Sequence, residues 1–207
     1  MIPAQLIGLA ASLSLLAGWR LYLTVLAAGL AMRFGWINAP AHTGLGVIAS
    51  YPVLGVAAAG TLAEFFADKI AWVDSVWDTV HTLIRPLGGA LVASAIIDPN
   101  DPATQITTLL LGGSAALLTH TAKASTRALV NTSPEPFSNI AVSAAEDGAT
   151  TGLLALVLAH PWLGGGIAAL LMIAAALIIR AAWRALHRVR LWWRRTRTRI
   201  VSQSGGR

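Results

Sequence analysis

Charged residues stand inside or directly beside apolar stretches that are long enough to cross a lipid bilayer. A charged group in hydrocarbon costs several kcal/mol, so such side chains usually face one another or a hydrated cavity. Groups of this kind bind ions, transfer protons or hold polar solutes within a membrane. The residues in question are Arg20, Glu64, Asp68, His120, Lys123, Glu146 and Asp147.

Their spacing places most of them on shared helical faces, because residues three and four positions apart lie on the same side of an α-helix. One such stripe consists of Asn139, Ser143, Glu146 (or Asp147) and Thr150. The two others are Thr61, Glu64 and Asp68, and His120, Lys123 and Arg127. We therefore expect two acidic stripes to pair with a basic one, either around a polar cavity or as purely structural ion pairs.

Carboxylates are also dense after the second apolar run. The candidates are Glu64, Asp68, Asp74 and Asp78, which share helical faces in pairs if both stretches are helical. Carboxylate oxygens bind Mg²⁺ or Ca²⁺, so these residues are weak candidates for a metal site. The alternative is a solvated loop with local pairing by Lys69, and no other cofactor is expected.

Six apolar runs must position these residues, at about 4–33, 45–67, 79–97, 103–123, 139–160 and 162–184. A membrane-spanning helix needs roughly 20 largely apolar residues. Hydrophobic residues make up 56% of the 207-residue chain, which excludes an ordinary soluble domain. The runs lack the alternation of barrel strands, and the absence of cysteine excludes disulfides and thiolate sites. The sequence predicts an all-α, polytopic transmembrane bundle with about six spans.

Charge is distributed unevenly along the chain. Residues 1–179 carry six basic and nine acidic side chains, whereas residues 180–207 carry nine arginines and no acid. We therefore divide the chain into a transmembrane domain, 1–184, and a basic tail, 185–207. Basic residues next to a span stay in the cytoplasm and contact anionic phospholipids, and no nucleic-acid-binding motif is present. The expected lipid anchors are Trp183, Arg184, Arg188, Trp192, Trp193, Arg194 and Arg195.

A cytoplasmic tail and six spans also place the N-terminus in the cytoplasm. Thirteen of the 15 basic residues then lie on the cytoplasmic side, as the positive-inside rule requires. In this arrangement the segments 69–85 and 123–138 are cytoplasmic loops. The first run is longer than one bilayer crossing, so Gly18 and Trp19 beside Arg20 indicate a kink, a tilt or a broken helix.

The motifs also occur in a specific order. They are Gly18-x-Arg20, Glu64-x3-Asp68-Lys69-x4-Asp74-x3-Asp78, Arg85-Pro86-x-Gly88, His120-x2-Lys123-x3-Arg127 and Asn139-x3-Ser143-x2-Glu146-Asp147. In this order the chain resembles the bacterial membrane proteins known as domain of unknown function 4126, over most of residues 5–180. The resemblance implies a multi-pass protein of the bacterial inner membrane and supports treating these residues as one set. It supplies no activity.

The two halves of the chain, 1–97 and 103–184, each begin with a run bearing basic residues and continue with one bearing acidic residues. With three spans each they would be inverted repeats, an architecture that places a transport site at the repeat interface. We expect a small transporter or channel for an ion or small polar solute. Assembly into a homo-oligomer is compatible with this expectation. Its pathway would be lined by Arg20, Glu64, Asp68, Lys69, His120, Lys123, Arg127, Asn139, Ser143, Glu146 and Asp147.

Two other functions fit the same residues, although an enzyme is less expected than a transporter. The first is a membrane-embedded enzyme that acts on a lipid phosphate headgroup. In that case the carboxylates would hold a metal, and the phosphate would contact Lys69, Arg85, Lys123 and Arg127. The second is a structural or assembly protein, in which the ion pairs specify how the helices pack.

Overall fold

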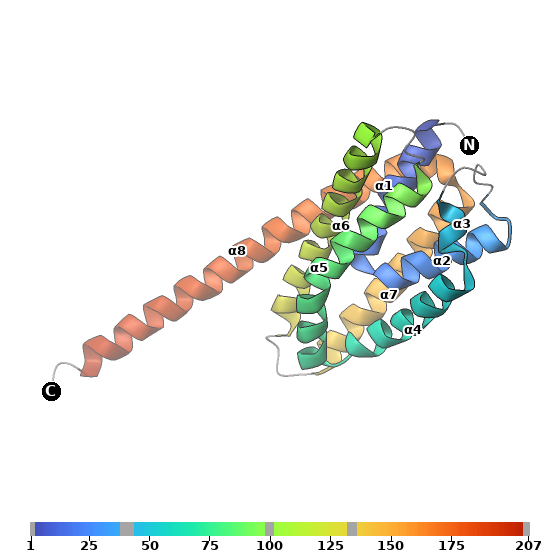
Figure 1. The fold of residues 1–207 in the computed structure, drawn as a ribbon. Coiled ribbons are helices and arrows are strands. Elements are labelled where there is room, and N and C mark those ends of the chain that lie inside the picture. The colour runs from blue at the N-terminus through green and yellow to red at the C-terminus, as the bar shows by residue number, and fades with distance from the viewer. Residues whose placement is uncertain (1–2, 38–43, 98–101, 132–135, 205–207) are drawn as a thin grey trace.

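The computed structural model describes residues 3–37, 44–97, 102–131 and 136–204, and beyond Arg188 it describes the backbone alone. These residues form helices and short connections, with no strand among them. The helices are α1 (Pro3–Trp19), α2 (Leu21–Arg33), α3 (Leu45–Ile48), α4 (Tyr51–Ala67), α5 (Ala71–Ile96), α6 (Pro102–Val130), α7 (Pro136–Ala159) and α8 (Gly164–Ser204), with the 3₁₀ turn η1 (Pro161–Leu163) before α8 (Figure 1). The predicted all-α bundle is confirmed.

Charged side chains lie inside this bundle, and large apolar side chains cover its outside. Arg85 is fully buried, whereas Leu83, two residues earlier, is 75% exposed. In water both features would cost free energy, because charges lose hydration and apolar surface stays wet. In hydrocarbon the same distribution is favourable, since polar groups must face protein or water. The bundle is therefore built for a membrane.

Three of the described helical segments are long and apolar enough to cross a membrane. They are α5, the stretch Phe137–Ala159 of α7, and η1 with the first part of α8, Pro161–Arg188. Shorter apolar helices are Ala4–Trp19, Leu21–Arg33 and Tyr51–Ala67. Membrane insertion follows from these helices.

Helix α5 begins at Ala71, eight residues before the apolar run from which a span was predicted. The expectation of a loop over residues 69–85 is therefore wrong, because the segment is helical from Ala71 onward. The helix has two faces: exposed apolar residues on one side are Trp72, Val76, Val80 and Leu83, and buried polar residues on the other are Asp74, Asp78, His81 and Arg85. The mean hydropathy of the first two turns of α5 is too low for the sequence to indicate that they belong to a span. Their period of 3.6 nevertheless fits a helix whose charged face is covered by protein.

Arg20 interrupts the first apolar run. Its backbone has φ −140° and ψ 84°, outside the helical region, and it separates α1 from α2. The Arg20 N–H still donates to the Leu16 carbonyl at 2.8 Å, and its own carbonyl accepts from the N–H of Thr24 at 3.0 Å. Of the three alternatives that the sequence left open, a broken helix is confirmed.

Helix α1 runs in the same direction as α6. Gly8 packs against Gly165 at the start of α8, and Gly18 packs against Ala116 in the middle of α6. Helix α1 thus enters the bundle from the end where α8 begins and stops near the centre (Figure 1).

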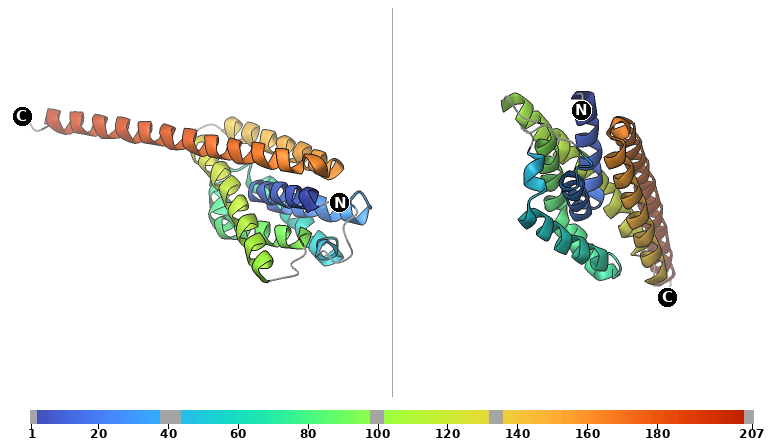
Figure 2. Two further views of the ribbon diagram at one scale, coloured as in Figure 1. Left: turned by 90° about the horizontal axis from the view of Figure 1, so that it is seen from above. Right: turned by 90° about the vertical axis from the view of Figure 1, so that its right-hand side faces the viewer.

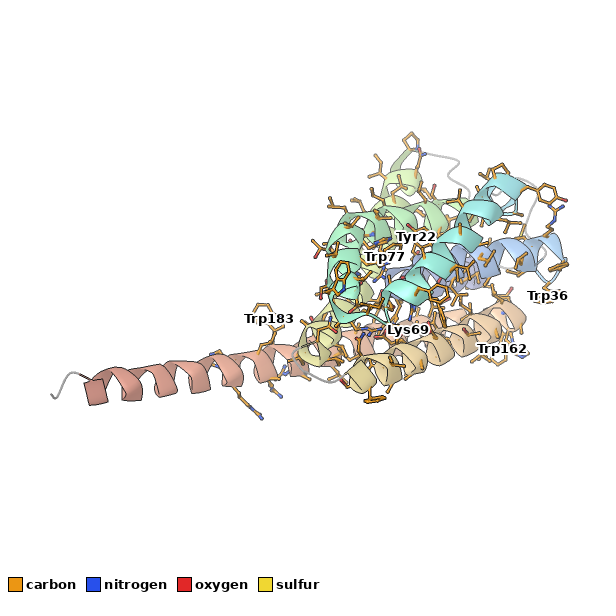
Figure 3. All side chains as sticks on the ribbon, turned by 90° about the horizontal axis from the view of Figure 1, so that it is seen from below. Tyr22, Trp36, Lys69, Trp77, Trp162 and Trp183 are labelled. Atoms are coloured by element: carbon orange, nitrogen blue, oxygen red, sulfur yellow. The ribbon has the colours of Figure 1, made fainter. Side chains whose placement is uncertain are left out.

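Helix α2 then returns alongside α4 in the opposite direction. Tyr22 lies against Gly60 in the second half of α4, and Arg33 donates to the hydroxyl of Tyr51 at its start. Both ends of the α1–α2 unit lie at the same end of the bundle, where α4, α6 and α8 also begin. We call this end of the bundle the Trp162 end. The opposite end, where α4 meets α5, is called the Lys69 end (Figure 3). Because the chain reverses at Arg20, residues 4–33 form a hairpin and not the single crossing that the run predicted.

Small residues bring α1, α5 and α6 into close contact at the centre. A Cβ atom on Gly18 would collide with the Ala116 carbonyl, and one on Gly89 would collide with the Ala116 side chain. The Ser14 hydroxyl donates to the Gly89 carbonyl at 3.0 Å. Close glycine contacts and hydroxyl bonds between helices are typical of helix packing in membranes. They set the distances at which the polar side chains of these helices meet.

Helix α8 packs against α1 and α6 and then leaves the bundle at the Lys69 end (Figures 1 and 2). Its 41 residues correspond to about 60 Å, roughly twice the hydrocarbon thickness of a bilayer. The backbone continues as a helix through the expected boundary between residues 184 and 185. The basic segment is thus a continuation of the last apolar helix as far as Ser204.

Candidate functional site

The break between α1 and α2 places Arg20 against carboxylates from two other parts of the chain. Arg20 Nη1 lies 2.6 Å from Asp68 Oδ2, and Nη2 lies 2.7 Å from Asp147 Oδ1. Lys123 Nζ approaches the same Asp68 oxygen at 2.7 Å. Arg127 Nη2 also lies 3.5 Å from this oxygen, so three cations share one fully buried carboxylate, which joins the hairpin, the end of α4 and α6.

Arg85 forms the second centre of the network. Its Nη2 donates to Glu64 Oε1 at 2.6 Å, and its Nη1 lies 3.2 Å from Asp78 Oδ1. The same Nη1 donates to His120 Nδ1 at 2.8 Å. Arg85 thus connects α4, α5 and α6 from a position without solvent exposure.

These contacts determine the tautomer of His120. Arginine can only donate, so Nδ1 of His120 accepts and Nε2 carries the hydrogen. Nε2 then donates to the Thr82 hydroxyl at 3.0 Å, and this hydroxyl donates to the Asp78 carbonyl at 2.9 Å. His120 is therefore a neutral connector between Arg85 and the backbone of α5.

Arg127 holds the network together at the Lys69 end. Its Nη2 donates to Glu146 Oε2 at 2.8 Å, and its Nη1 donates to Asn139 Oδ1 at 2.7 Å. Arg127 Nη1 and Asn139 Nδ2 also donate to the Asp68 carbonyl, at 3.3 and 3.1 Å. This carbonyl lies where α4 ends and lacks a helical partner. Side chains of α6 and α7 thus cap α4 and hold the short turn into α5.

The network extends from the Lys69 end to the middle of the bundle. At the end of α6, Asn131 donates to Asp74 Oδ2 at 3.0 Å. His120 lies eleven residues earlier on the same helix, which corresponds to about 16 Å. This is about half of the hydrocarbon thickness of a bilayer. A continuous chain of polar side chains therefore joins one end of the bundle to its centre.

The structure brings the predicted pathway residues together, and their acidic and basic stripes pair. The buried members are Arg20, Glu64, Asp68, His120, Lys123, Arg127, Asn139, Ser143 and Glu146. At the edge, Lys69 Nζ lies 3.4 Å from both Ser143 Oγ and Asp147 Oδ2. These residues come from α4, α6 and α7, from the turn after α4 and from the break between α1 and α2.

Sequence reasoning missed the central role of Arg85. The signal was present, because Asp74, Asp78, His81 and Arg85 recur at spacings of four, three and four. That is the spacing of the stripe that starts at Asn139. The expectation of a loop over residues 69–85 hides this signal, because the spacing places all four side chains on one face only if the whole segment is helical. Tyr22, whose hydroxyl lies 3.1 Å from His81 Nε2, is a single polar residue without a periodic signal.

The carboxylates considered as metal ligands do not form a common cage. Each of them faces arginine or lysine side chains: Glu64, Asp68, Asp74 and Asp78. Among the described residues, no group of three or more His, Cys, Asp or Glu side chains is arranged to hold a metal ion. The geometry therefore does not favour the Mg²⁺ or Ca²⁺ site.

The expected lipid anchors lie on the part of α8 that leaves the bundle. Trp183, Arg184 and Arg188 are exposed, with Trp183 pointing away from the bundle (Figure 3). The side chains of Trp192, Trp193, Arg194 and Arg195 lie outside the described residues.

A pocket of about 210 Å³ opens beside the network, between α2, α4 and α7. Its lining residues are Arg20, Leu23, Thr61, Glu64, Phe65, Asp147 and Thr151. Lys69 lies between α4 and α7, with its Nζ 3.3 Å from the centre of the Phe65 ring (Figure 3). A larger pocket of about 510 Å³, between α2, α3, α4 and α5, has an almost entirely apolar lining and lies apart from the ion pairs.

The fold and the network define an all-helical membrane protein with a charged interior. The chain matches the family described as Domain of unknown function (DUF4126) over residues 7–181, and it belongs to this family. Searches against functionally described proteins and against solved structures give no match. The family resemblance inferred from the motifs is confirmed, and the matched range includes every residue of the network.

Proposed function

We propose that this protein is a small transporter or channel for an ion or a small polar solute. The observation that carries the proposal is the buried chain of charged side chains that leads from the Lys69 end to a polar pocket at the Arg20 break. Buried ion pairs stabilise a fold little more than apolar packing does. Their concentration in one place therefore supports a functional role. Interrupted helices near mid-depth are also where transporters bind their substrates.

The interactions around the pocket differ in strength. Arg85, Glu64 and Lys123 are fully buried and form a framework. The Lys69–Asp147 pair is about one quarter exposed on both sides and has a longer contact of 3.4 Å. A partly exposed pair of this kind contributes at most about 1 kcal/mol. Rotation of Lys69 away from Asp147 therefore costs little free energy, and it would open the pocket toward the Lys69 end.

We place the Lys69 end on the cytoplasmic side of a bacterial plasma membrane, because the arginine-rich part of α8 leaves the bundle there. That part of α8 would contact anionic phospholipids. The N-terminus then lies on the opposite side, since α1 starts at the Trp162 end. This replaces the sequence-based expectation that both termini are cytoplasmic.

Flux measurements on purified protein in liposomes test the proposal. The ions are H⁺, Na⁺, K⁺ and small anions, and the variant is Asp147→Asn, which removes the charge that Arg20 and Lys69 share. We expect its flux to fall at least about tenfold, the effect of roughly 1.4 kcal/mol on a rate. The control is Arg33→Gln, an exposed arginine at the Trp162 end, which should transport like the wild type. Equal flux in Asp147→Asn and wild type would remove the pocket from the pathway.

The lipid-phosphate enzyme has less support. The side chains that would contact phosphate are engaged with carboxylates or a histidine: Arg85, Lys123 and Arg127. A structural role explains the ion pairs, but it does not explain the pocket beside them. Absence of flux from inserted wild-type protein would favour these two alternatives.

A further inference from the structure

We propose that the pocket between α2, α4 and α7 binds a small monovalent cation. The inference rests on the proposed transport function and names its substrate class. It is carried by the charge of the network, by one unpaired carboxylate oxygen and by the acceptors that line the pocket.

The network around the pocket holds one more negative than positive group when all six carboxylates are ionised and His81 and His120 are neutral. Its anions are Glu64, Asp68, Asp74, Asp78, Glu146 and Asp147. Its cations are Arg20, Lys69, Arg85, Lys123 and Arg127. An uncompensated charge away from water is costly, and a bound monovalent cation would neutralise it.

Glu64 presents part of this charge to the pocket. Its Oε1 accepts from Arg85 at 2.6 Å, whereas Oε2 is buried and has no hydrogen-bond partner among the described residues. The side chain is 1% exposed and lines the pocket. A buried carboxylate oxygen without a partner forfeits its interaction with water, so a cation in the pocket would supply the missing contact.

Two threonines add further acceptors. The Thr61 hydroxyl donates to the Ala57 carbonyl at 2.7 Å, and the Thr151 hydroxyl donates to the Asp147 carbonyl at 2.8 Å. Their hydrogens are used within their own helices, so lone pairs of the oxygens stay available as acceptors. The hydroxyls can therefore receive a cation, but they have no hydrogen left for an anion.

Among the polar groups that line the pocket, acceptors thus outnumber donors. Arg20 is its strong donor: its Nη1 and Nη2 lie against Asp68 and Asp147, and its Nε is buried without a hydrogen-bond partner among the described residues. The volume of about 210 Å³ equals the liquid volume of roughly seven water molecules at about 30 Å³ each. This space suits a small cation that keeps part of its hydration shell. An anion would meet the carboxylates of Glu64 and Asp147 and be repelled.

Equilibrium binding of radioactive Na⁺ to detergent-purified protein tests the site, with K⁺ and NH₄⁺ as competitors at constant ionic strength. The variants are Thr61→Val, Thr151→Val and Glu64→Gln. The matched control is Thr121→Val, because the Thr121 hydroxyl also donates to a carbonyl of its own helix but lies outside the pocket. We expect saturable binding in wild type and control, and an affinity at least about tenfold lower in the three variants.

The threonine variants change no charge, so they keep the test valid if Glu64→Gln fails to fold. Absence of saturable binding of all three cations to wild type would overturn the proposal. Unchanged affinity in both Thr61→Val and Thr151→Val would also overturn it.

Liposome flux of the same proteins separates this inference from the proposed function. Parallel loss of binding and flux in Thr61→Val is the result expected if both hold. Saturable binding without any flux in wild type would contradict transport and support the cation site. Full flux in Thr61→Val, without cation binding to wild type, would contradict the site and support transport of another solute.

Discussion

Arg85 connects more of the buried polar groups than its place in the sequence suggests. Its guanidinium contacts Glu64, Asp78 and His120, which belong to three helices. A single planar group with five donors can serve all three at once. The charged interior therefore depends on the geometry of one side chain as well as on net charge.

Replacement of Arg85 by methionine should strongly destabilise the fold. Glu64 and Asp78 would then be buried with fewer partners, and removal of one member of a buried ion pair costs about 3–5 kcal/mol. Thermal unfolding of the detergent-purified protein, followed by circular dichroism, measures the effect. Arg33→Met, at an exposed arginine, is the control and should change stability much less. Equal stability of Arg85→Met and wild type would show that these carboxylates do not depend on Arg85.

Arg85→Lys should be intermediate in the same unfolding assay. Lysine keeps the charge, but its compact ammonium cannot reproduce the fork through which arginine reaches its partners. We expect a loss of about 1–3 kcal/mol, the cost of buried acceptors that lose a hydrogen bond. A stability as low as that of Arg85→Met would indicate that geometry matters more than charge.

At the scale of the helices, the α1–α2 hairpin is the element that organises the site. Its break places Arg20 at the centre of the bundle, where the Arg20 side chain contacts both Asp68 and Asp147. A continuous helix over residues 4–33 would carry the chain to the Lys69 end. The hairpin also makes the two halves unequal, because α6, the first helix of the second half, has no such break. With residues 4–33 as a hairpin, the first half no longer has the three spans that the inverted repeat requires.

Close packing of α1 on α6 can be tested with a pair of glycine variants. Gly18→Ala adds a Cβ that collides with the Ala116 carbonyl and the Thr119 side chain. We expect it to lower the free energy of unfolding by about 1–3 kcal/mol, the usual cost of overpacking. Gly148 on α7 has no neighbour within 4 Å of such a Cβ in the described structure. Gly148→Ala should therefore be neutral or stabilising by about 0.5–1 kcal/mol.

Thermal unfolding again measures both glycine variants. A Gly18→Ala protein as stable as the wild type would contradict the close crossing of α1 and α6. No atom of the described chain lies within 4 Å of a Cβ placed on Gly148 or Gly152. If Gly148→Ala lowers the free energy of unfolding, we would infer that another copy of the chain packs against Gly148.

At the scale of the whole molecule, the hairpin places the two termini at opposite ends of the bundle. The chain has no native cysteine, so single cysteines can be introduced directly. Ala4→Cys and Trp36→Cys should react with a membrane-impermeant maleimide added to intact cells. Arg188→Cys should react only after permeabilisation. Labelling of Ala4→Cys and Arg188→Cys from the same side would contradict the arrangement.

The sequence by itself determined the class of this protein. Long apolar runs and charges spaced at three and four residues indicated membrane helices with polar faces. These properties depend on local periodicity, which is visible in one dimension. The confirmed resemblance to the family depended on the order of the same motifs, so it too could be predicted without a structure.

Tertiary structure alone decided which charges meet and how the chain reaches them. Arg85 and Glu64 are 21 residues apart, and Lys123 and Asp68 are 55 apart, so their pairing follows from helix packing. The start of α5 at Ala71 depends on tertiary structure, because its charged face is stable in a membrane only where other helices cover it. The reversal at Arg20 is set by backbone torsions and by ion pairs with distant carboxylates. None of these long-range contacts leaves a periodic signal in the sequence, which is why the pocket beside them could not be predicted.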